Sequence, residues 1–250
     1  MMEMFSESHC HLRGANREAM EKAERAGVEL ILTAGIDMAS SEEAVETADE
    51  FGIVKGSVGI HPWYADEYSP ENLVKLRELA KRGEVVAISE IGLDFVGRMT
   101  HQWERSDEVI DPDIQRAALR GQIGLAKELG LPVLVHDRAP GEEVLDILGE
   151  TGIVDVGAAI HGFTKGPGYA ERAVGMGVYL SIGRGLVRGG NEELEEAIRR
   201  TPLEWLLTET DSGDPTGVLQ VAERIAELKG ATRDEVGLAA TRNLKKLLKL

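Results

Sequence analysis

The feature that most constrains the fold of this chain is a regular alternation of short β-rich runs with longer stretches of helical periodicity. Strands that alternate with helices form parallel sheets. Eight such repeats in 250 residues predict closure into a TIM-type (β/α)8 barrel, because barrels of this kind typically need about 250 residues. We therefore expect an α/β fold in a single domain, residues 1–250. The eight predicted strands are MFSESH from Met4, VELILTAGI from Val28, IVKGSVGI from Ile53, VVAISEIGL from Val85, PVLVHD from Pro132, VGAAIHGF from Val156, GVYLSIG from Gly177 and WLLTETD from Trp205.

Amphipathic stretches fill the spaces between these runs, and residues typical of helix ends bound them. The predicted starts are Asn16, Ser40, Ser69 and either Asp111 or Asp113, and the predicted ends are Gly27, Gly52, Gly83 and Gly130. Two more helical stretches close the chain. The first strand continues into HCHLRG without a GxGxxG loop, which argues against an open dinucleotide-binding sheet. The polar stretch VGRMTHQWERSDEVIDPD after Phe95 is predicted to be a loop over the top of the barrel.

Charge excludes one class of function. The chain has 44 acidic and 28 basic residues, a net charge of -16. A protein that coats nucleic acid needs a basic surface, whereas a small phosphate-bearing substrate can be held by metal ions. One cysteine allows no intramolecular disulfide. No apolar run approaches the ~20 residues of a membrane helix and the N-terminus has no secretory pattern, so we expect a cytoplasmic monomer that does not contact membranes.

Histidine placement predicts where the chemistry lies. Five of the six histidines stand where a predicted strand ends, and so do Glu90 in SEIGLD and Asp211 in TETD. Active sites of these barrels lie at the carboxyl ends of the strands. His9 and His11 are two residues apart and share one face of a strand, while Cys10 between them is expected to pack toward the helices. The five histidines are His9, His11, His61, His136 and His161.

The predicted ligands exceed what one structural zinc ion needs. They suit two divalent ions about 3.5–4 Å apart that share a carboxylate. Glu90 is central in the strand order and is the expected bridge, and Asp211 is the expected general base. Glu209 should point inward like Asp211 and orient a ligand histidine. Zinc, manganese, iron and magnesium all remain possible. The predicted metal ligands are His9, His11, Glu90, His136, His161 and Asp211.

Seven segments of the chain resemble, in order and spacing, the TatD family of metal-dependent hydrolases within the amidohydrolase superfamily. They are SHCHL, GIHPW, SEIGLDF, LPVLVHDR, HGF, LSIG and LTETD, and the resemblance runs from His9 to about Asn243. It implies a distorted TIM barrel with one or two divalent ions. It also implies that His9, His11 and Asp211 bind the first ion, that Glu90 bridges, and that His136 and His161 hold the second. Members commonly act as deoxyribonucleases from 3′ ends, and some remove D-amino acids from tRNA.

Three further residues are predicted to act on the substrate side. His61 has no assigned metal and is a candidate for holding a substrate oxygen or leaving group, although a packed loop histidine is an equal alternative. Arg138 could grip a phosphate or form a plain surface ion pair. Trp63, together with Tyr64 and Trp103, could stack on bases or pack within loops.

The chain departs from the family pattern at three places, and these keep alternatives open. Glu7 stands where the family usually has Asp, the stretch after GLDF is longer than usual, and only SGDPTG separates Asp211 from the next helix. The favoured prediction is a phosphodiesterase, a 3′-5′ deoxyribonuclease that acts on DNA. The first alternative is a hydrolase of a carbonyl substrate, such as an amide, an ester, a lactone or D-aminoacyl-tRNA. The second is a metal-stabilised interaction barrel that is not an enzyme.

Overall fold

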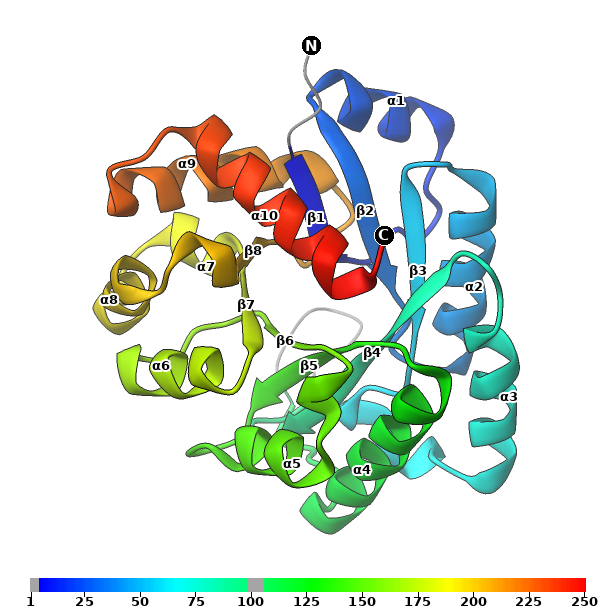
Figure 1. Ribbon diagram of the computed structural model, residues 1–250. Helices are drawn as coiled ribbons and strands as arrows, with labels where there is room; N and C mark the ends of the chain where they lie inside the picture. The colour runs from blue at the N-terminus through cyan, green and yellow to red at the C-terminus, as the bar shows by residue number, and fades with distance from the viewer. Residues whose placement is uncertain (1–4, 99–105) are drawn as a thin grey trace.

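A computed structural model describes residues 5–98 and 106–250. Eight parallel strands follow one another around a nearly closed barrel in the order β1 to β8, with helices on the outside, which confirms the predicted TIM (β/α)8 architecture (Figure 1). Every adjacent pair of strands from β1–β2 to β7–β8 is parallel. The strands are β1 Phe5–Cys10, β2 Val28–Ala34, β3 Val54–Val58, β4 Val85–Asp94, β5 Val133–Arg138, β6 Ala158–His161, β7 Val178–Ile182 and β8 Leu206–Thr208.

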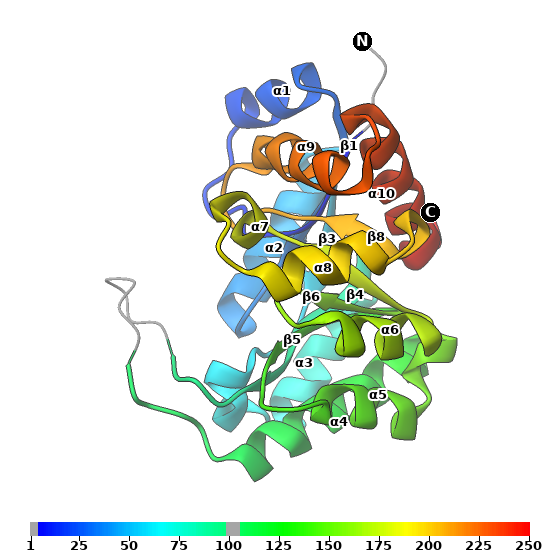
Figure 2. The same cartoon turned by 90° about the vertical axis from the view of Figure 1, so that its left-hand side faces the viewer.

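Helices connect the strands and cover the outer face of the barrel. They are α1 Arg17–Arg25, α2 Met38–Glu50, α3 Pro70–Ala80, α4 Pro112–Leu129, α5 Glu143–Thr151, α6 Pro167–Gly175, α7 Arg184–Arg188, α8 Glu192–Arg200, α9 Val218–Lys229 and α10 Arg233–Leu248. The described part of the chain also has four short 3-10 helices: η1 Pro62–Glu67, η2 Ile153–Asp155, η3 Leu203–Trp205 and η4 Pro215–Gly217. The described segments on either side of residues 99–105 extend from one end of the barrel (Figure 2).

Helix starts were predicted better than helix ends. The side chains of Asn16, Ser69 and Asp111 accept hydrogen bonds from the first turns of α1, α3 and α4, as predicted. The prediction of Ser40 was wrong, because Asp37 caps α2 and Ser40 lies inside the helix, where its hydroxyl completes a capping box with Asp37.

Among the predicted helix ends, only Gly130 is itself the cap. Its φ of 68° places it in the left-handed region that glycine adopts without strain. Gly27, Gly52 and Gly83 lie one or two residues beyond the caps of α1, α2 and α3. A glycine near a helix end therefore located the turn but not the exact cap, since Gly27 also has a positive φ, 90°, and lies one residue beyond the cap of α1.

The barrel separates two apolar clusters. The larger one fills the layer between the strands and the helices. The smaller one lies among inward-facing strand residues such as Leu32, Leu134 and Leu207, and side chains of α10 pack against it. Figure 1 shows α10 crossing this end of the barrel. The end opposite the predicted metal ligands is therefore closed by an apolar plug, and the polar inward-facing residues gather at the other end.

Side chains close the barrel between its first and last strands. Among the described strands, β8 and β1 form no ladder. Instead, Ser8 Oγ donates to the carbonyl of Thr208 at 3.0 Å, and Thr208 Oγ1 donates to the carbonyl of Ser6 at 2.8 Å. Beyond the strand ends, the Asp211 N–H donates to the carbonyl of His9 at 3.0 Å. This seam places the segment that carries Asp211 beside the strand that carries His9.

Glu7 is a further contact between β1 and the segment that follows β8. It is fully buried, and one carboxylate oxygen accepts the backbone N–H groups of His9 and Thr210, each at 3.0 Å. Burial raises the pKa of Glu7 well above its ordinary value. The longer side chain at this position thus has a structural role, since it connects the residue beside Asp211 to a predicted metal ligand.

No helix among the described residues is both long and apolar enough to cross a membrane. Cys10 is free and buried, packed in the outer apolar layer as expected, with its Sγ 3.6 Å from the carbonyl of Leu32.

Candidate metal centre

The predicted ligands converge at the carboxyl ends of the strands, although two strands run further than expected. His161 is the last residue of β6, and His11 follows the end of β1 directly. The expectation that Glu90 ends the fourth strand was wrong, because β4 continues to Asp94. In the same way β5 continues two residues beyond His136. A continuous apolar pattern does not mark where a ladder stops, so sequence placed these side chains on the correct strands but not at their ends.

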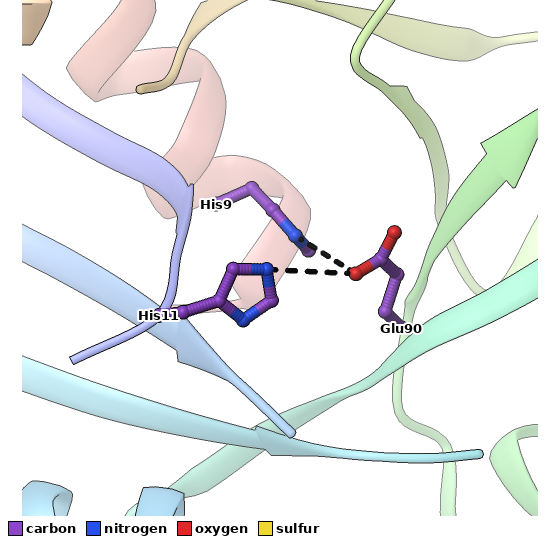
Figure 3. Close-up of side chains that lie close together, drawn as sticks. All are labelled: His9, His11 and Glu90. Carbon is purple, nitrogen blue, oxygen red and sulfur yellow. Dashed lines mark ion pairs between the residues drawn. The ribbon is translucent and has the colours of Figure 1, made fainter. Parts of the chain in front are cut away.

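Glu90 is the centre of the site. Its side chain is almost fully buried, and one oxygen, Oε2, faces the two histidines of the first strand segment (Figure 3). His9 Nε2 lies 3.3 Å and His11 Nε2 lies 3.7 Å from Oε2. His11 Nε2 also lies 3.3 Å from Asp211 Oδ1, and the side chain of Asp211 is half-exposed. Two of the three residues predicted for the first ion thus lie beside one oxygen of the predicted bridge, and the third, Asp211, contacts His11.

The other oxygen of Glu90, Oε1, faces three more histidines. His161 Nε2 lies at 2.7 Å, His136 Nδ1 at 2.9 Å and His61 Nε2 at 3.2 Å. His136 Nδ1 and His161 Nε2 are themselves 3.2 Å apart. One carboxylate therefore has imidazoles against both of its oxygens, as the prediction of a bridging residue requires, and the two groups meet where the rings of His9 and His161 stack with centroids 3.8 Å apart.

Burial and charge act in opposite directions on this cluster. Burial disfavours the charged form of Glu90, but the surrounding imidazoles, His161 foremost, hold its pKa well below the ordinary value. Burial also disfavours a charged His161, but Glu90 and Glu209 outweigh it and raise the pKa of His161 well above the ordinary value. For His9, burial prevails and lowers the pKa. The ionised carboxylate of Glu90 thus lies among histidines whose pKa values are shifted in opposite directions.

Buried polar atoms without hydrogen bonds indicate that the cluster is built to bind something. Both ring nitrogens of His9 are buried and make no hydrogen bond within the described part of the chain. Such an atom costs roughly 1–3 kcal/mol when left unpaired. Imidazole nitrogens and carboxylate oxygens are ligands of zinc, manganese and iron. Within residues 5–98 and 106–250, two groups have donor atoms close enough for one ion each: His9, His11 and Glu90, and His61, Glu90 and His136. The residues present therefore fit divalent metal ions.

Two carboxylates hold the outer nitrogens of the ligand histidines. Glu209 Oε1 lies 3.5 Å from His161 Nδ1, in agreement with its predicted orienting position. Asp94 Oδ2 lies 2.9 Å from His136 Nε2, and no prediction included it. Burial disfavours the charged carboxylate of Asp94, but His136 lowers its pKa to about 2. The signal was present in the sequence, since Asp94 lies four residues after Glu90 in the same strand and therefore has the same inward parity.

His61 is fixed by the backbone that follows it. It precedes η1, and its Nδ1 accepts the N–H of Trp63 at 3.1 Å. The proton of the neutral ring therefore lies on Nε2, the nitrogen that faces Glu90. Burial lowers the pKa of His61 to about 4, which keeps the ring neutral. His61 is buried and lies beside the predicted metal ligands, so it is a packed loop histidine that is also close to the site.

The predicted substrate-side aromatic and arginine residues have defined contacts. Trp63 is half-buried, and its indole N–H donates to Asp94 Oδ2 at 2.9 Å, so it packs against a residue that contacts His136. Arg138 makes no ion pair in the described chain, which excludes the surface ion pair there. Its Nη1 donates to the carbonyl of Gly162 at 3.0 Å. Trp103 and His101 lie outside the described residues.

Comparison with known proteins agrees with this geometry. The family model described as TatD related DNase matches residues 7–249. The Bacillus subtilis protein named uncharacterized metal-dependent hydrolase YabD is 33% identical and covers 99% of this chain and 100% of its own. Human deoxyribonuclease TATDN3 is 29% identical, over 96% of this chain and 92% of its own. The crystal structure of the TatD homologue YjjV from Escherichia coli K12 superposes with a TM-score of 0.85 at 25% identity and full coverage of both chains. This chain belongs to the TatD family of metal-dependent hydrolases.

Proposed function

We propose that this enzyme hydrolyses phosphodiester bonds at the 3′ ends of DNA. The observation that carries the proposal is the single buried carboxylate, Glu90, with imidazoles against both of its oxygens and the half-exposed Asp211 at its edge. Such a site has a closed ligand side and an open substrate side, which is the arrangement that catalytic metal sites need. The name of human TATDN3 supports DNA as the substrate.

In this proposal the ligand sets are those expected from the sequence. His9, His11 and Asp211 would hold one ion, and His136 and His161 would hold the other. Glu90 would touch both ions. When bound, divalent ions lower the pKa of water and stabilise negative charge on the phosphoryl oxygens. The identity of the metal among zinc, manganese, magnesium and iron stays a proposal to be tested by the activity of each loaded form.

Asp211 is the proposed general base. Burial opposes its ionisation, but the hydrogen bond from His11 and the neighbouring histidines hold its pKa below the ordinary value, so it is a carboxylate at neutral pH. Its side chain is the half-exposed member of the cluster. A carboxylate that touches both the ligand cluster and solvent can accept the proton of the attacking water.

His61 is the proposed donor to the substrate. Its Nε2–H faces the cluster, and a ring nitrogen that carries a proton donates a hydrogen bond and does not ligate a metal ion. We therefore assign it to a substrate oxygen or leaving group, and we leave it out of the ligand set although its distances would permit it. Arg138 keeps free N–H groups for the scissile phosphate, and Trp63 forms the adjacent wall.

The test is a nuclease assay with an active-site substitution and a matched control. Single-stranded DNA labelled at its 5′ end should be shortened from the 3′ end by protein loaded with divalent ions. Asp211→Asn should reduce the rate about 10²–10⁴-fold. Asp214→Asn, in the same loop but paired with Lys22 and Thr216, should remain active. A protein that cleaves esters or lactones but no DNA would instead support a carbonyl hydrolase.

A further inference from the structure

Two arginines at the carboxyl end of the barrel have no acidic partner among the described residues. Other cations have acidic partners, as Lys165 has Asp137 at 2.9 Å and Lys22 has Asp214 at 2.9 Å. Arg138 and Arg184 contact only backbone carbonyls. In a chain of net charge -16, an uncompensated arginine beside a predicted active site indicates that an anion neutralises it there.

Both arginines are held in place and keep free donors. Arg138 Nη1 donates to the carbonyl of Gly162 at 3.0 Å. Arg184 Nε donates to the carbonyl of Thr210 at 2.9 Å, and the rest of this side chain is exposed. A guanidinium has five N–H groups, so both terminal nitrogens of Arg184 remain available. A planar pair of donors matches the oxygens of a phosphate.

The wall between the two arginines is tightly packed around Glu209. The N–H of Gly162 donates to Glu209 Oε1 at 2.6 Å. A Cβ atom at Gly183, the residue before Arg184, would lie only 3.1 Å from the same oxygen. The ends of β6, β7 and β8 therefore form one continuous surface, with Arg138 on β5 and Arg184 after β7 on either side of β6. The positions of the two guanidinium groups are consequently set by the barrel and not by independent loops.

The two arginines face different parts of the site. Arg138 lies two residues after His136 on the same strand, next to the proposed scissile phosphate. Arg184 is anchored on Thr210, the residue before Asp211, beyond β6 from Arg138. The rim further from the site is acidic. The first turn of α8 contains three glutamates, and Glu193 Oε2 would lie 3.3 Å from a Cβ atom built at Gly166. Glutamates on the rim therefore lie near the positive charge of these arginines.

We propose that Arg184 binds a substrate phosphate other than the one that is cleaved, so that the preferred substrate is a short single-stranded end with at least two phosphates. This inference rests on the proposed phosphodiesterase function and adds a specificity residue to it. The acidic rim beyond Arg184 disfavours further contacts with a long strand, since each additional phosphate would meet carboxylates.

The kinetic test compares two substrates that differ in the number of phosphates. Arg184→Gln should raise KM for the trinucleotide dT3 about tenfold or more, the value of one charge-assisted hydrogen bond. It should change kcat/KM for p-nitrophenyl thymidine phosphate, which has a single phosphodiester, less than about twofold. Arg184→Lys should recover part of the loss. Arg188→Gln is the matched control, because Arg188 is exposed in the same short helix. Equal losses on both substrates, or none on either, would overturn the proposal.

A binding test separates this inference from the proposed function. Fluorescein-labelled dT3 is titrated into metal-free protein, and its affinity should fall about tenfold in Arg184→Gln. The slope of log K against log salt should become shallower by about 0.7, the value for one contact with a single strand. If the wild type binds dT3 in this manner but cleaves no phosphodiester, the proposed function fails and the inference stands. If the wild type and Arg184→Gln bind dT3 equally, the inference fails.

Discussion

The proton of His61 is placed by a backbone contact and not by the metal cluster. Because Nδ1 accepts the N–H of Trp63, the ring presents Nε2–H to Glu90. The sequence motif GIHPW indicated a histidine at the mouth of the barrel, but a motif contains no information on which nitrogen is protonated. At the residue scale, function therefore depends on a contact two positions along the chain.

This arrangement predicts a pH dependence of stability for the metal-free protein. The pKa of His61 is lowered to about 4, below its ordinary value near 6.5, so the unfolded chain binds a proton in this window and the folded chain does not. As the pH falls from 7 to 5, the free energy of unfolding of the wild type should decrease by on the order of 1–2 kcal/mol relative to that of His61→Gln. Thermal unfolding in the presence of a chelator, followed by circular dichroism at several pH values, measures this difference.

His11 provides a control of opposite sign. Burial lowers its proton affinity, but the hydrogen bond to Asp211 and the charge of Glu90 outweigh burial and raise its pKa. The stability that protonated His11 contributes is thus present at low pH and is lost as the pH rises through the pKa of His11 in the folded protein. Relative to His11→Gln, wild type should therefore gain stability as the pH falls from 8 to 6. Parallel stability profiles for wild type and both variants would contradict these assignments.

At the scale of elements, α10 closes the end of the barrel opposite the site. Leu244 is fully buried in the inner apolar cluster, whereas Leu238 of the same helix is 39% exposed. Leu244→Ala should lower the free energy of unfolding by about 2–5 kcal/mol, since it removes apolar contacts and leaves a cavity. Leu238→Ala should change it by no more than about 0.5 kcal/mol. Urea denaturation compares the two, and a similar loss in both variants would show that α10 does not plug the barrel.

Element boundaries were harder to predict than the elements themselves. All eight strands were expected from their runs of branched residues, and all eight are present. The predicted fourth strand stopped at Leu93, one residue before the end of β4, but Glu90 was wrongly expected to end it, because the pattern in SEIGLD does not mark the last residue of the ladder. The same uncertainty concealed Asp94 as a partner of His136. Ladder pairing with β5 decides where β4 stops, and that information lies in a different segment of the chain.

For the whole molecule, the decisive experiment is removal of the metal. The cluster places unpaired buried nitrogens around one carboxylate, so bound ions should stabilise the folded state. At a metal concentration of 100 times Kd this stabilisation is about 2.7 kcal/mol. Chelation should then lower Tm by roughly 5–10 °C for a protein of this size and abolish hydrolysis, and added divalent ions should restore both.

A variant without the bridge is the control for this experiment. Glu90→Gln should have a Tm that responds little to the chelator, because the group shared by both ligand sets is gone. If chelation changes neither the Tm nor the activity of the wild type, the view of this protein as a metal-dependent enzyme would be wrong. That the chain forms one domain and that it is a monomer both stay predictions. Sedimentation can test the second.

The sequence by itself determined the architecture, the family and most of the residues that meet in the site. Alternation of strands and helices is a local property, and the rule that strand ends meet at one face of a barrel makes it global. Only the tertiary structure decided how the site is held together: Asp94 behind His136, the seam of Ser8 and Thr208 that brings Asp211 beside His9, and the placement of Arg184 on Thr210. These contacts join residues from different strands, and their geometry depends on strand lengths and register that no local pattern specifies.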